Sequence, residues 1–439
     1  MWTISGMRLV SIFFFIISGT TVSVHATATQ KGDVPLLAIE GPLHIVRQPQ
    51  AAEVSVHLIF GHSARTSEMH YVEHLTWLNM TGNAVSEQDS NAWTTHNAVG
   101  YRLVGSANEL GTMLHTLARV FAPIRLSERF AEQERDIILR EYDLRMKTDP
   151  EAHVTWKMQA FLYEGTVLAA PVLGTPEEIR KFDFPTAKAL HAATHRPDRA
   201  FLVIIGNIAP EQVHVAMRRA EFPVLGEGER RYAPLHLHLK PPAKRRFRFR
   251  QNAGPRLVWR KAVTLNAPVQ FDLLEARCAL LGDLLRANLP GGLAGPLLYD
   301  GALVRRFDIR IRALDESHVE MRFEAAPDRS VSLQKLLDAF EGALSDVAAS
   351  GIPERTFIRV RNRFDAFWPD WKNRRQTADW LGHYVLRRIS ALRRPMKIPQ
   401  LRGLIRKLDG SSLNVLLRSL AGPGRTAVAF LEDVRGKYR

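Results

Sequence analysis

The sequence His70-Tyr71-Val72-Glu73-His74 places two imidazoles and a carboxylate within one apolar, helix-like segment. Residues four apart on a helix lie on one face, so His70 and His74 can both reach a single metal ion. Glu73 projects from nearly the same side, where its carboxylate can hold a water bound to that metal. A catalytic zinc usually has three protein ligands and one water, so this interpretation requires a further ligand from elsewhere.

A second helix-like segment, which begins near Ser127, offers acidic candidates for the missing ligand. Glu134 and Glu141 are seven residues apart, and therefore two helical turns apart on one face. One of them can bind the metal while the other supports a histidine from behind. Such a pair alone is ordinary helix surface. Its position after the motif is what favours a role in the site.

The two segments together resemble the pitrilysin/insulinase family of zinc peptidases, the inverzincins, which include mitochondrial processing peptidase. The resemblance implies that His70, His74 and Glu141 bind one zinc ion. It also implies that Glu134 is the supporting carboxylate and that Glu73 is the general base.

Further segments of the first half are similar to family patterns. They are Asn91-Ala-Trp-Thr-Thr, Leu173-Gly-Thr-Pro-Glu-Glu-Ile and Phe201-Leu-Val-Ile-Ile-Gly-Asn-Ile. In the family, the first of these is an edge strand that pairs with the substrate peptide. The resemblance therefore makes Asn91, Ala92 and Trp93 candidate substrate-binding residues.

The second half resembles the family less closely. Gly291-Gly-Leu-Ala-Gly-Pro-Leu-Leu-Tyr299 is similar to the glycine-rich start of the family's partner domain. Family members that act alone carry an Arg and a Tyr shortly afterwards, which bind the substrate carbonyl. Here Val304 stands where the family pattern has the Tyr, and its side chain cannot donate a hydrogen bond to an oxyanion. Arg305 or Arg306 could replace the Arg, but strand alternation points only one of them inward. We therefore expect a dimer in which a related chain supplies these residues.

The elements that must position these side chains recur along the chain. Strands are expected at residues 35–46, 54–60 and 91–104, and Thr66 or Ser67 can cap the motif helix. A short buried strand at 201–205 follows. After an interrupted stretch between residues 225 and 255, a similar order of strands and helices begins again.

This repetition predicts an α+β fold of two related α/β sandwich halves that form a clamshell chamber. Each half is expected to be a mostly antiparallel sheet with helices packed on it. The predicted domains are a zinc-binding peptidase domain at 29–225, a linker at 226–246, and a related domain without metal at 247–439.

The amino terminus has the pattern of a secretory signal. Arg8 precedes an apolar run at residues 9–17, and small residues suited to cleavage follow at 24–28. We expect residues 1–28 to be a signal peptide and the protein to be exported, to the periplasm in a Gram-negative bacterium. An uncleaved anchor is the alternative. Cys278, the only cysteine, excludes an intrachain disulfide and is expected to be buried.

Composition restricts the classes of partner. An apolar content of 46% and a charged content of 24% are typical of a folded globular protein. The net charge of +15 is concentrated at residues 244–250 and in the arginine-rich carboxy-terminal half. No groove-reading module accompanies it, so we do not expect nucleic-acid binding. Weak attraction to acidic peptides or an anionic membrane surface is one interpretation, and a solvated basic face is the other.

The predicted function is hydrolysis of unfolded peptides by a zinc-dependent endopeptidase, through a metal-bound water with Glu73 as general base. The alternative is a catalytically weak or silent structural or peptide-binding subunit in a heteromeric complex of related chains. His57, His62 and His96 lie near the motif in sequence but lack paired spacing. We interpret them as structural or rim histidines.

Overall fold

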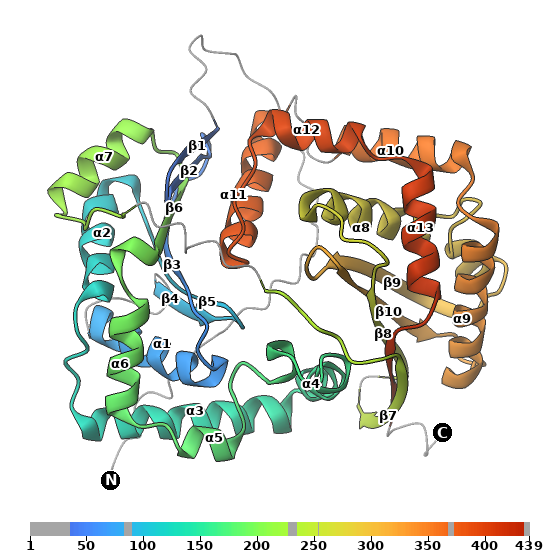
Figure 1. Ribbon diagram of the computed structural model, residues 1–439, viewed down its shortest axis with the longest axis horizontal. Helices are drawn as coiled ribbons and strands as arrows, with labels where there is room; N and C mark the ends of the chain where they lie inside the picture. Colours follow the sequence, from blue (N-terminus) through green and yellow to red (C-terminus); the bar gives the residue numbers. More distant parts are fainter. Residues whose placement is uncertain (1–35, 83–89, 227–234, 253, 368–372, 434–439) are drawn as a thin grey trace.

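The protein consists of two halves, each built on one β-sheet, in a computed structural model that describes residues 36–82, 90–226, 235–252, 254–367 and 373–433. The halves face each other, and helices α4 and α11 lie between the two sheets (Figure 1). The predicted α+β clamshell of two related halves is confirmed. The predicted signal peptide at 1–28 lies outside the described residues, as do residues 227–234 of the predicted linker.

The first half contains a six-stranded sheet in the order β1-β2-β6-β3-β5-β4. Its strands are β1 (Leu37–Glu40), β2 (Leu43–Arg47), β3 (Val54–Gly61), β4 (Ser90–Thr94), β5 (Ala98–Gly105) and β6 (Ala200–Gly206). Its helices are α1 (Thr66–Thr81), α2 (Leu110–Ala118), α3 (Glu128–Thr148), α4 (Pro150–Leu162), α5 (Pro176–Arg180), α6 (Phe184–Thr194) and α7 (Pro210–Arg219). Every pairing is antiparallel except that of β2 with β6.

The second half contains a five-stranded sheet in the order β7-β11-β8-β10-β9. Its strands are β7 (Ala243–Gln251), β8 (Arg256–Thr264), β9 (Val304–Ala313), β10 (His318–Pro327) and β11 (Arg425–Asp433). Its helices are α8 (Phe271–Arg286), α9 (Leu333–Ser350), α10 (Glu354–Phe367), α11 (Arg374–Ser390), α12 (Ile398–Arg406) and α13 (Gly410–Ala421), with a π-helical turn at Gly295–Tyr299. The strand order repeats that of β2, β6, β3, β5 and β4, with the one parallel pair in the equivalent place.

The strand expected over residues 91–104 is two strands in the structure. Strands β4 and β5 form a hairpin whose turn is closed by the Thr95 amide, which donates to the Ala98 carbonyl at 2.7 Å. The Thr95 hydroxyl lies 3.3 Å from Asn97 Oδ1 in the same turn. The single-strand prediction is therefore wrong, and β4 becomes an edge strand of the first sheet.

Helix α1 is buried along almost its whole length. Its apolar residues Tyr71, Val72 and Leu75 belong to the core between the first sheet and helices α2, α3 and α6. The Tyr71 hydroxyl donates to the Ala131 carbonyl of α3 at 2.8 Å, which ties the two helices together. The polar residues of the motif are thus enclosed by protein.

Each half contributes one helix to the sheet of the other. Helix α4 packs through Val154, Met158 and Leu162 on strands of the second sheet, where Val258 and Ala429 contact it. Helix α11 packs on the first sheet, against residues that include Val46, Ile59, Phe201 and Val203. The exchange buries apolar surface between the halves. The predicted division at 226–246 stays a prediction.

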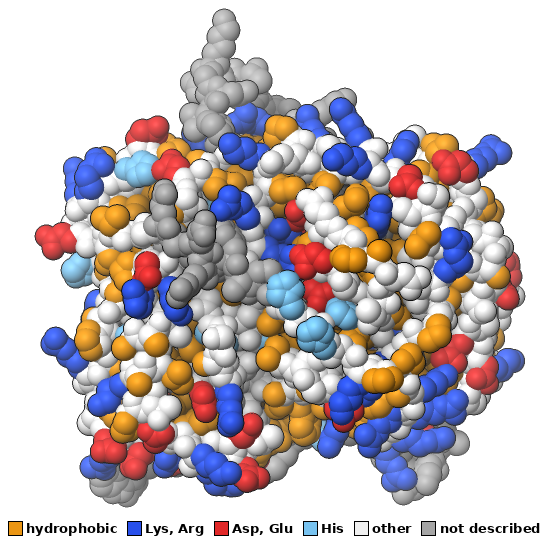
Figure 2. All heavy atoms as spheres, viewed as in Figure 1, with side chains coloured by type: hydrophobic (Ala, Val, Ile, Leu, Met, Phe, Trp, Pro, Cys, Tyr) orange, Lys and Arg blue, Asp and Glu red, His pale blue; other side chains and the backbone are white. Residues whose placement is uncertain are grey.

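Strand β7 is a basic edge of the second sheet. Its exposed side chains include Lys244, Arg245, Arg246, Arg248 and Arg250. Figure 2 shows Lys and Arg side chains gathered over this end of the molecule. Lys244 forms an ion pair with Glu341 at 2.7 Å and Arg248 one with Glu432 at 2.8 Å, and Arg246 donates to the Gln334 side chain at 3.2 Å.

Cys278 is buried in α8, as expected. Among the residues that the structure describes, no helix combines the length and the apolar character needed to cross a membrane.

Replacing Met158 of α4 by Ala should lower the free energy of unfolding by about 2–5 kcal/mol, because this fully buried side chain joins the halves. Val415→Ala on α13, where the side chain is 55% exposed, is the control and should change it by about 0.5 kcal/mol or less. Denaturant unfolding measures both. Equal effects of the two substitutions would show that the α4 contact contributes little.

Candidate metal centre

Helix α1 directs both histidines of the motif to one point. The rings of His70 and His74 lie with their centroids 4.7 Å apart, as the four-residue spacing predicts. His70 has no exposed surface, and His74 is 5% exposed.

Helix α3 brings two carboxylates to the histidines. Glu141 Oε2 lies 3.9 Å from His70 Nε2 and 3.7 Å from His74 Nε2. Two turns earlier, Glu134 Oε2 lies 3.3 Å from His74 Nδ1. The structure therefore brings together the predicted ligands and the predicted supporting carboxylate.

The atoms that converge have no hydrogen-bond partner within the described part of the chain. They are His70 Nε2, His74 Nε2 and Glu141 Oε2. A buried polar atom left unpaired costs about 1–3 kcal/mol. The three residues can offer ligand atoms that all lie within 4.8 Å of one another, and two imidazoles with a carboxylate are donors that zinc prefers. The residues present fit a divalent metal ion.

Glu134 determines how His74 can act. When His74 Nδ1 donates its proton to Glu134, Nε2 keeps its lone pair and faces Glu141. Burial lowers the pKa of His74, but the hydrogen bond with Glu134 and the charges of Glu73 and Glu141 outweigh it and raise that pKa. Metal and proton would therefore compete for Nε2.

His70 is in a different electrostatic setting. Burial, together with the charges of His74 and Arg145, holds the pKa of His70 well below its usual value. The neutral form, which is the form that binds metal, is thus favoured.

Glu73 lies beside the converging atoms, with Oε2 3.7 Å from His70 Nε2. The Thr94 hydroxyl of edge strand β4 donates to the same oxygen at 3.2 Å. The side chain is buried, and burial raises the pKa of Glu73 to about 7. Thr94 therefore links the candidate general base to the strand expected to bind the peptide.

Two contacts of the site were not predicted from the sequence. Arg145 Nη2 lies 2.7 Å from Glu141 Oε1, whereas the other oxygen, Oε2, faces the histidines. Its position four residues after Glu141 was a usable signal, because such residues are neighbours on a helix. Thr94 has no local signal, since its partner Glu73 lies in another element.

The candidate substrate-binding residues 91–93 lie on β4. The Ala92 side chain is buried in the first core, and Trp93 packs toward α11. The Trp93 ring packs against Gly100 of β5, where a Cβ would stand 2.4 Å from a ring carbon. Asn91 Oδ1 accepts a hydrogen bond from the Ala92 amide at 2.9 Å. A contact of β4 with a peptide would therefore involve mainly the backbone.

The other histidines near the motif bind local groups. His57 contacts the Ser55 hydroxyl at 3.2 Å, His62 the Thr95 carbonyl at 3.1 Å, and His96 the Ala170 carbonyl at 3.0 Å.

The start of β9 places no hydrogen-bond donor at Val304, whose side chain lies in the second core. Arg305 is the extra residue of a β-bulge opposite Ala326 and Pro327, and its Nε donates to the Pro327 carbonyl at 3.1 Å. Arg306, which pairs with Ala326, is exposed.

No protein-family model matches the sequence. The sequence is similar to that of an uncharacterized zinc protease of Mycobacterium leprae, with 22% identity over 355 residues, which cover 74% of this chain and 76% of the relative.

Solved structures share the architecture. An M16-like peptidase from Alicyclobacillus acidocaldarius superposes with a TM-score of 0.70 and 16% identity, covering 89% of this chain and 95% of that one. The chain has the fold of the M16-like peptidases. The resemblance to pitrilysin/insulinase peptidases inferred from the motifs is thus confirmed.

Two further structures share this fold, one described as a protease and the other as an inactive domain. The periplasmic protease PqqL of Escherichia coli has a TM-score of 0.72 and 12% identity, and the match covers 91% of this chain but 48% of PqqL. An M16 peptidase domain from Pseudomonas fluorescens, described as inactive, has a TM-score of 0.65 and 11% identity over 88% of this chain and 95% of that one. The same fold therefore occurs in proteins described as proteases and in a domain described as inactive.

Glu134→Ala should weaken metal affinity by about 10- to 100-fold, because His74 loses the group that fixes its tautomer. Glu132→Ala, at an exposed position of the same helix, should leave affinity unchanged, and His74→Ala should abolish most binding. Competition titration of Zn²⁺ against a chromophoric chelator measures all three. Wild-type affinity in Glu134→Ala would contradict the supporting role.

Proposed function

We propose that this protein is a zinc-dependent endopeptidase that hydrolyses unfolded peptides, with one zinc ion held by His70, His74 and Glu141. The observation that carries the proposal is the convergence of these buried, otherwise unpartnered atoms beside Glu73. The similarity to a zinc protease of Mycobacterium leprae supports it.

The chemistry divides between the metal and Glu73. Bound zinc supplies a Lewis acid that polarises the scissile carbonyl and acidifies water. Glu73 accepts the proton of the attacking water at its carboxylate and passes it to the leaving amine. The hydrogen bond from Thr94 orients this carboxylate.

The peptide would bind as an added strand along β4, which pairs on one side with β5 and is at the sheet edge. Backbone hydrogen bonds supply most of the affinity in such an arrangement, so sequence preference is broad. In this proposal Asn91, Ala92 and Trp93 contribute through their backbone. Residues farther away must supply any selectivity.

For the cellular setting, we propose export through the signal at residues 1–28 and action in the periplasm. The support is the amino-terminal pattern and the structural likeness to a periplasmic protease.

A catalytically silent, peptide-binding subunit is the second candidate. It is favoured by the apolar Val304 and by the existence of an inactive domain of the same fold. Metal content measured together with cleavage of an unstructured peptide separates it from the endopeptidase, because the silent subunit would bind peptide without hydrolysis.

Glu73→Gln should retain the metal and reduce turnover by roughly 10²- to 10⁴-fold, because the amide keeps the size of the side chain but cannot accept the proton. Metal analysis and cleavage of a fluorogenic unstructured peptide are measured on the same preparation. Glu68→Gln, near the start of the same helix, is the control and should cleave normally. Normal turnover by Glu73→Gln would exclude the mechanism.

We further propose a dimer with a related chain. The related chain would supply the residues that bind the substrate carbonyl, because Val304 offers no side-chain donor for it. One missing oxyanion donor costs on the order of 10²- to 10³-fold in rate. Adding the companion should therefore raise the activity of the isolated chain by a comparable factor. Sedimentation analysis combined with peptide cleavage tests this. Undiminished activity of a strictly monomeric Arg305→Ala/Arg306→Ala variant would contradict it.

A further inference from the structure

The face of the second sheet that α4 contacts carries charged side chains in register across three strands. Arg310 of β9, Arg322 of β10 and Arg260 of β8 are direct neighbours in one row. In the adjacent rows, Arg312 lies opposite Glu320 and Asp308 opposite Glu324. The alternate residues of these strands, such as Ile309 and Phe323, are in the core on the other face.

Three arginines side by side repel one another, so this row requires compensation. Each guanidinium has a carboxylate partner: Arg310 contacts Asp308 at 2.8 Å, Arg322 contacts Glu324 at 2.7 Å, and Arg260 contacts Glu320 at 2.6 Å. Arg312 shares Glu320 with Arg260. On β9 and β10, residues 308–324 thus place three arginines and three carboxylates on this face. Strand β8 adds Arg260 and Arg256, and Arg256 contacts Glu324 at 2.8 Å.

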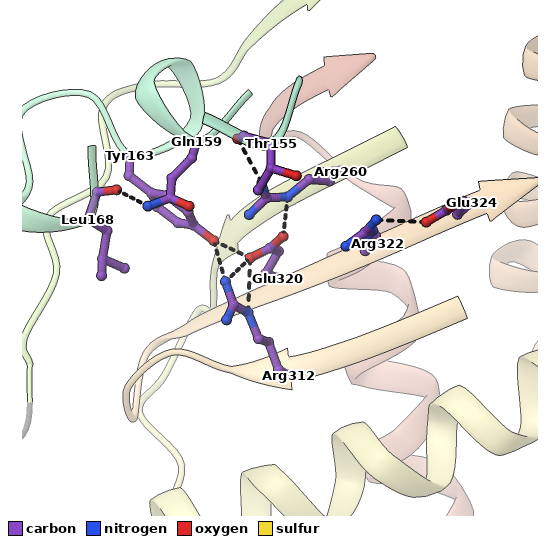
Figure 3. Close-up of polar contacts among 9 residues, drawn as sticks. All are labelled: Thr155, Gln159, Tyr163, Leu168, Arg260, Arg312, Glu320, Arg322 and Glu324. Carbon is purple, nitrogen blue, oxygen red and sulfur yellow. Dashed lines mark hydrogen bonds and ion pairs between the residues drawn. The ribbon is translucent and has the colours of Figure 1, made fainter. Parts of the chain in front are cut away.

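Glu320 fixes Arg312 in place, as Figure 3 shows. Its Oε2 accepts from Arg312 Nε at 3.0 Å and from Nη2 at 2.6 Å. The Tyr163 hydroxyl, at the end of α4, donates to the same oxygen, while Arg260 Nε donates to Oε1 at 2.6 Å. Burial raises the pKa of Glu320, but the charges of Arg260 and Arg312 outweigh it and hold that pKa far below the usual range. The carboxylate is therefore ionised.

Arg312 is nevertheless accessible. Its side chain is 60% exposed, whereas the side chain of Glu320 is 4% exposed. Nε and Nη2 are engaged, but Nη1 has no hydrogen-bond partner among the described residues. Arg310, two residues away on the same face of β9, is 64% exposed. Buried groups thus fix the orientation of the Arg312 guanidinium, and its Nη1 donors remain available to another acceptor.

This arginine lies close to the first half, which carries the candidate metal centre. In the turn that follows β4, His96 Nε2 lies 3.0 Å from the Ala170 carbonyl. The neighbouring Ala169 packs in the same apolar cluster as Tyr163, whose hydroxyl donates to Glu320 beside Arg312. Two residues before His96, Thr94 binds Glu73, and two residues of chain span at most about 7 Å. A peptide paired with β4 at the metal would therefore pass near Arg312.

We propose that Arg312, with Arg310 beside it, binds a carboxylate of the peptide, so that acidic peptides are preferred over neutral ones. This inference rests on the proposed endopeptidase function and specifies its substrate class. Arginine suits this role because its planar fork matches a carboxylate, and Glu320 holds it in a fixed orientation. The carboxylate has two sources, an Asp or Glu side chain or the carboxy terminus of the peptide.

The test uses fluorescently labelled unstructured peptides of small neutral residues that carry one Glu, moved position by position, each with a matched Gln peptide. Dissociation constants are measured by anisotropy in the Glu73→Gln background, so that no peptide is consumed. At one or more positions, Glu should bind about three- to tenfold tighter than Gln, as expected for a partly exposed charged contact. Arg312→Ala should remove this preference.

Controls separate local from general effects. Arg245→Ala removes an exposed arginine from β7, at the opposite edge of the same sheet, and should keep the preference. The Arg310 side chain pairs with Asp308 on its own strand. Arg310→Ala should weaken the preference for Glu, and it serves as the test variant if Arg312→Ala does not fold. Carboxy-terminal amidation distinguishes the sources, since loss of tight binding on amidation would assign the site to the terminal carboxylate.

The outcomes distinguish this inference from the proposed function. A Glu preference that survives in Arg312→Ala and Arg310→Ala, or the absence of any carboxylate preference in the parent, would overturn the inference while leaving the endopeptidase proposal intact. Conversely, an Arg312-dependent preference in a protein that cleaves no peptide would support carboxylate recognition and reject the endopeptidase.

Discussion

The arrangement of the first half depends on one constraint: two imidazoles and a carboxylate meet at one buried point, where the converging atoms have no hydrogen-bond partner in the part of the chain that the structure describes. Burial of unpaired polar atoms is unfavourable unless a further group binds them. Other residues must also keep these side chains from rotating toward new partners. Glu134 holds His74, Arg145 holds Glu141, and Thr94 holds Glu73. Each contact comes from a residue whose own element is packed into the core.

The helix that carries Glu141 also leads directly into the contact between the halves. Helix α3, which carries Glu141, ends at Thr148, and α4 begins at Pro150 under the Asp149 cap. Helix α4 then packs on the second sheet, and Tyr163 at its end contacts Glu320. One continuous stretch of chain thus runs from the candidate metal ligand Glu141 to Tyr163, which contacts the carboxylate that positions Arg312. The candidate metal centre and the arginine-bearing face of the second sheet are therefore parts of one packed unit.

Local spacing explains what could be predicted from the sequence. His70 and His74 are adjacent because of the helical repeat, and the separation of Glu134 from Glu141 follows from the same repeat. The hairpin at 95–97 was not predicted, because Thr and Asn in a turn compete weakly with the strong β-propensity on both sides. The expected cap at Thr66 or Ser67 was also wrong: both residues lie within α1, where Ser67 packs near Gly174. Its burial there depends on a segment far away in sequence.

The positions of the arginines also show what could not be predicted from the sequence. Composition shows a basic chain but does not separate two surfaces that differ physically. On β7, exposed basic side chains lie along a sheet edge, where charge discourages pairing with another chain. This favours the solvated basic face over a specific partner at that edge. On β9 and β10, arginines stand in register on the sheet face that α4 contacts, where Arg312 is oriented by a buried carboxylate. Within each strand the charged residues alternate with apolar ones. Which of them meet, such as Arg312 and Glu320 or Arg260 and Arg322, depends on strand register, for which the sequence carries no local signal. An immobile, half-solvated guanidinium loses little conformational entropy on binding an anion, unlike the mobile arginines of an open edge.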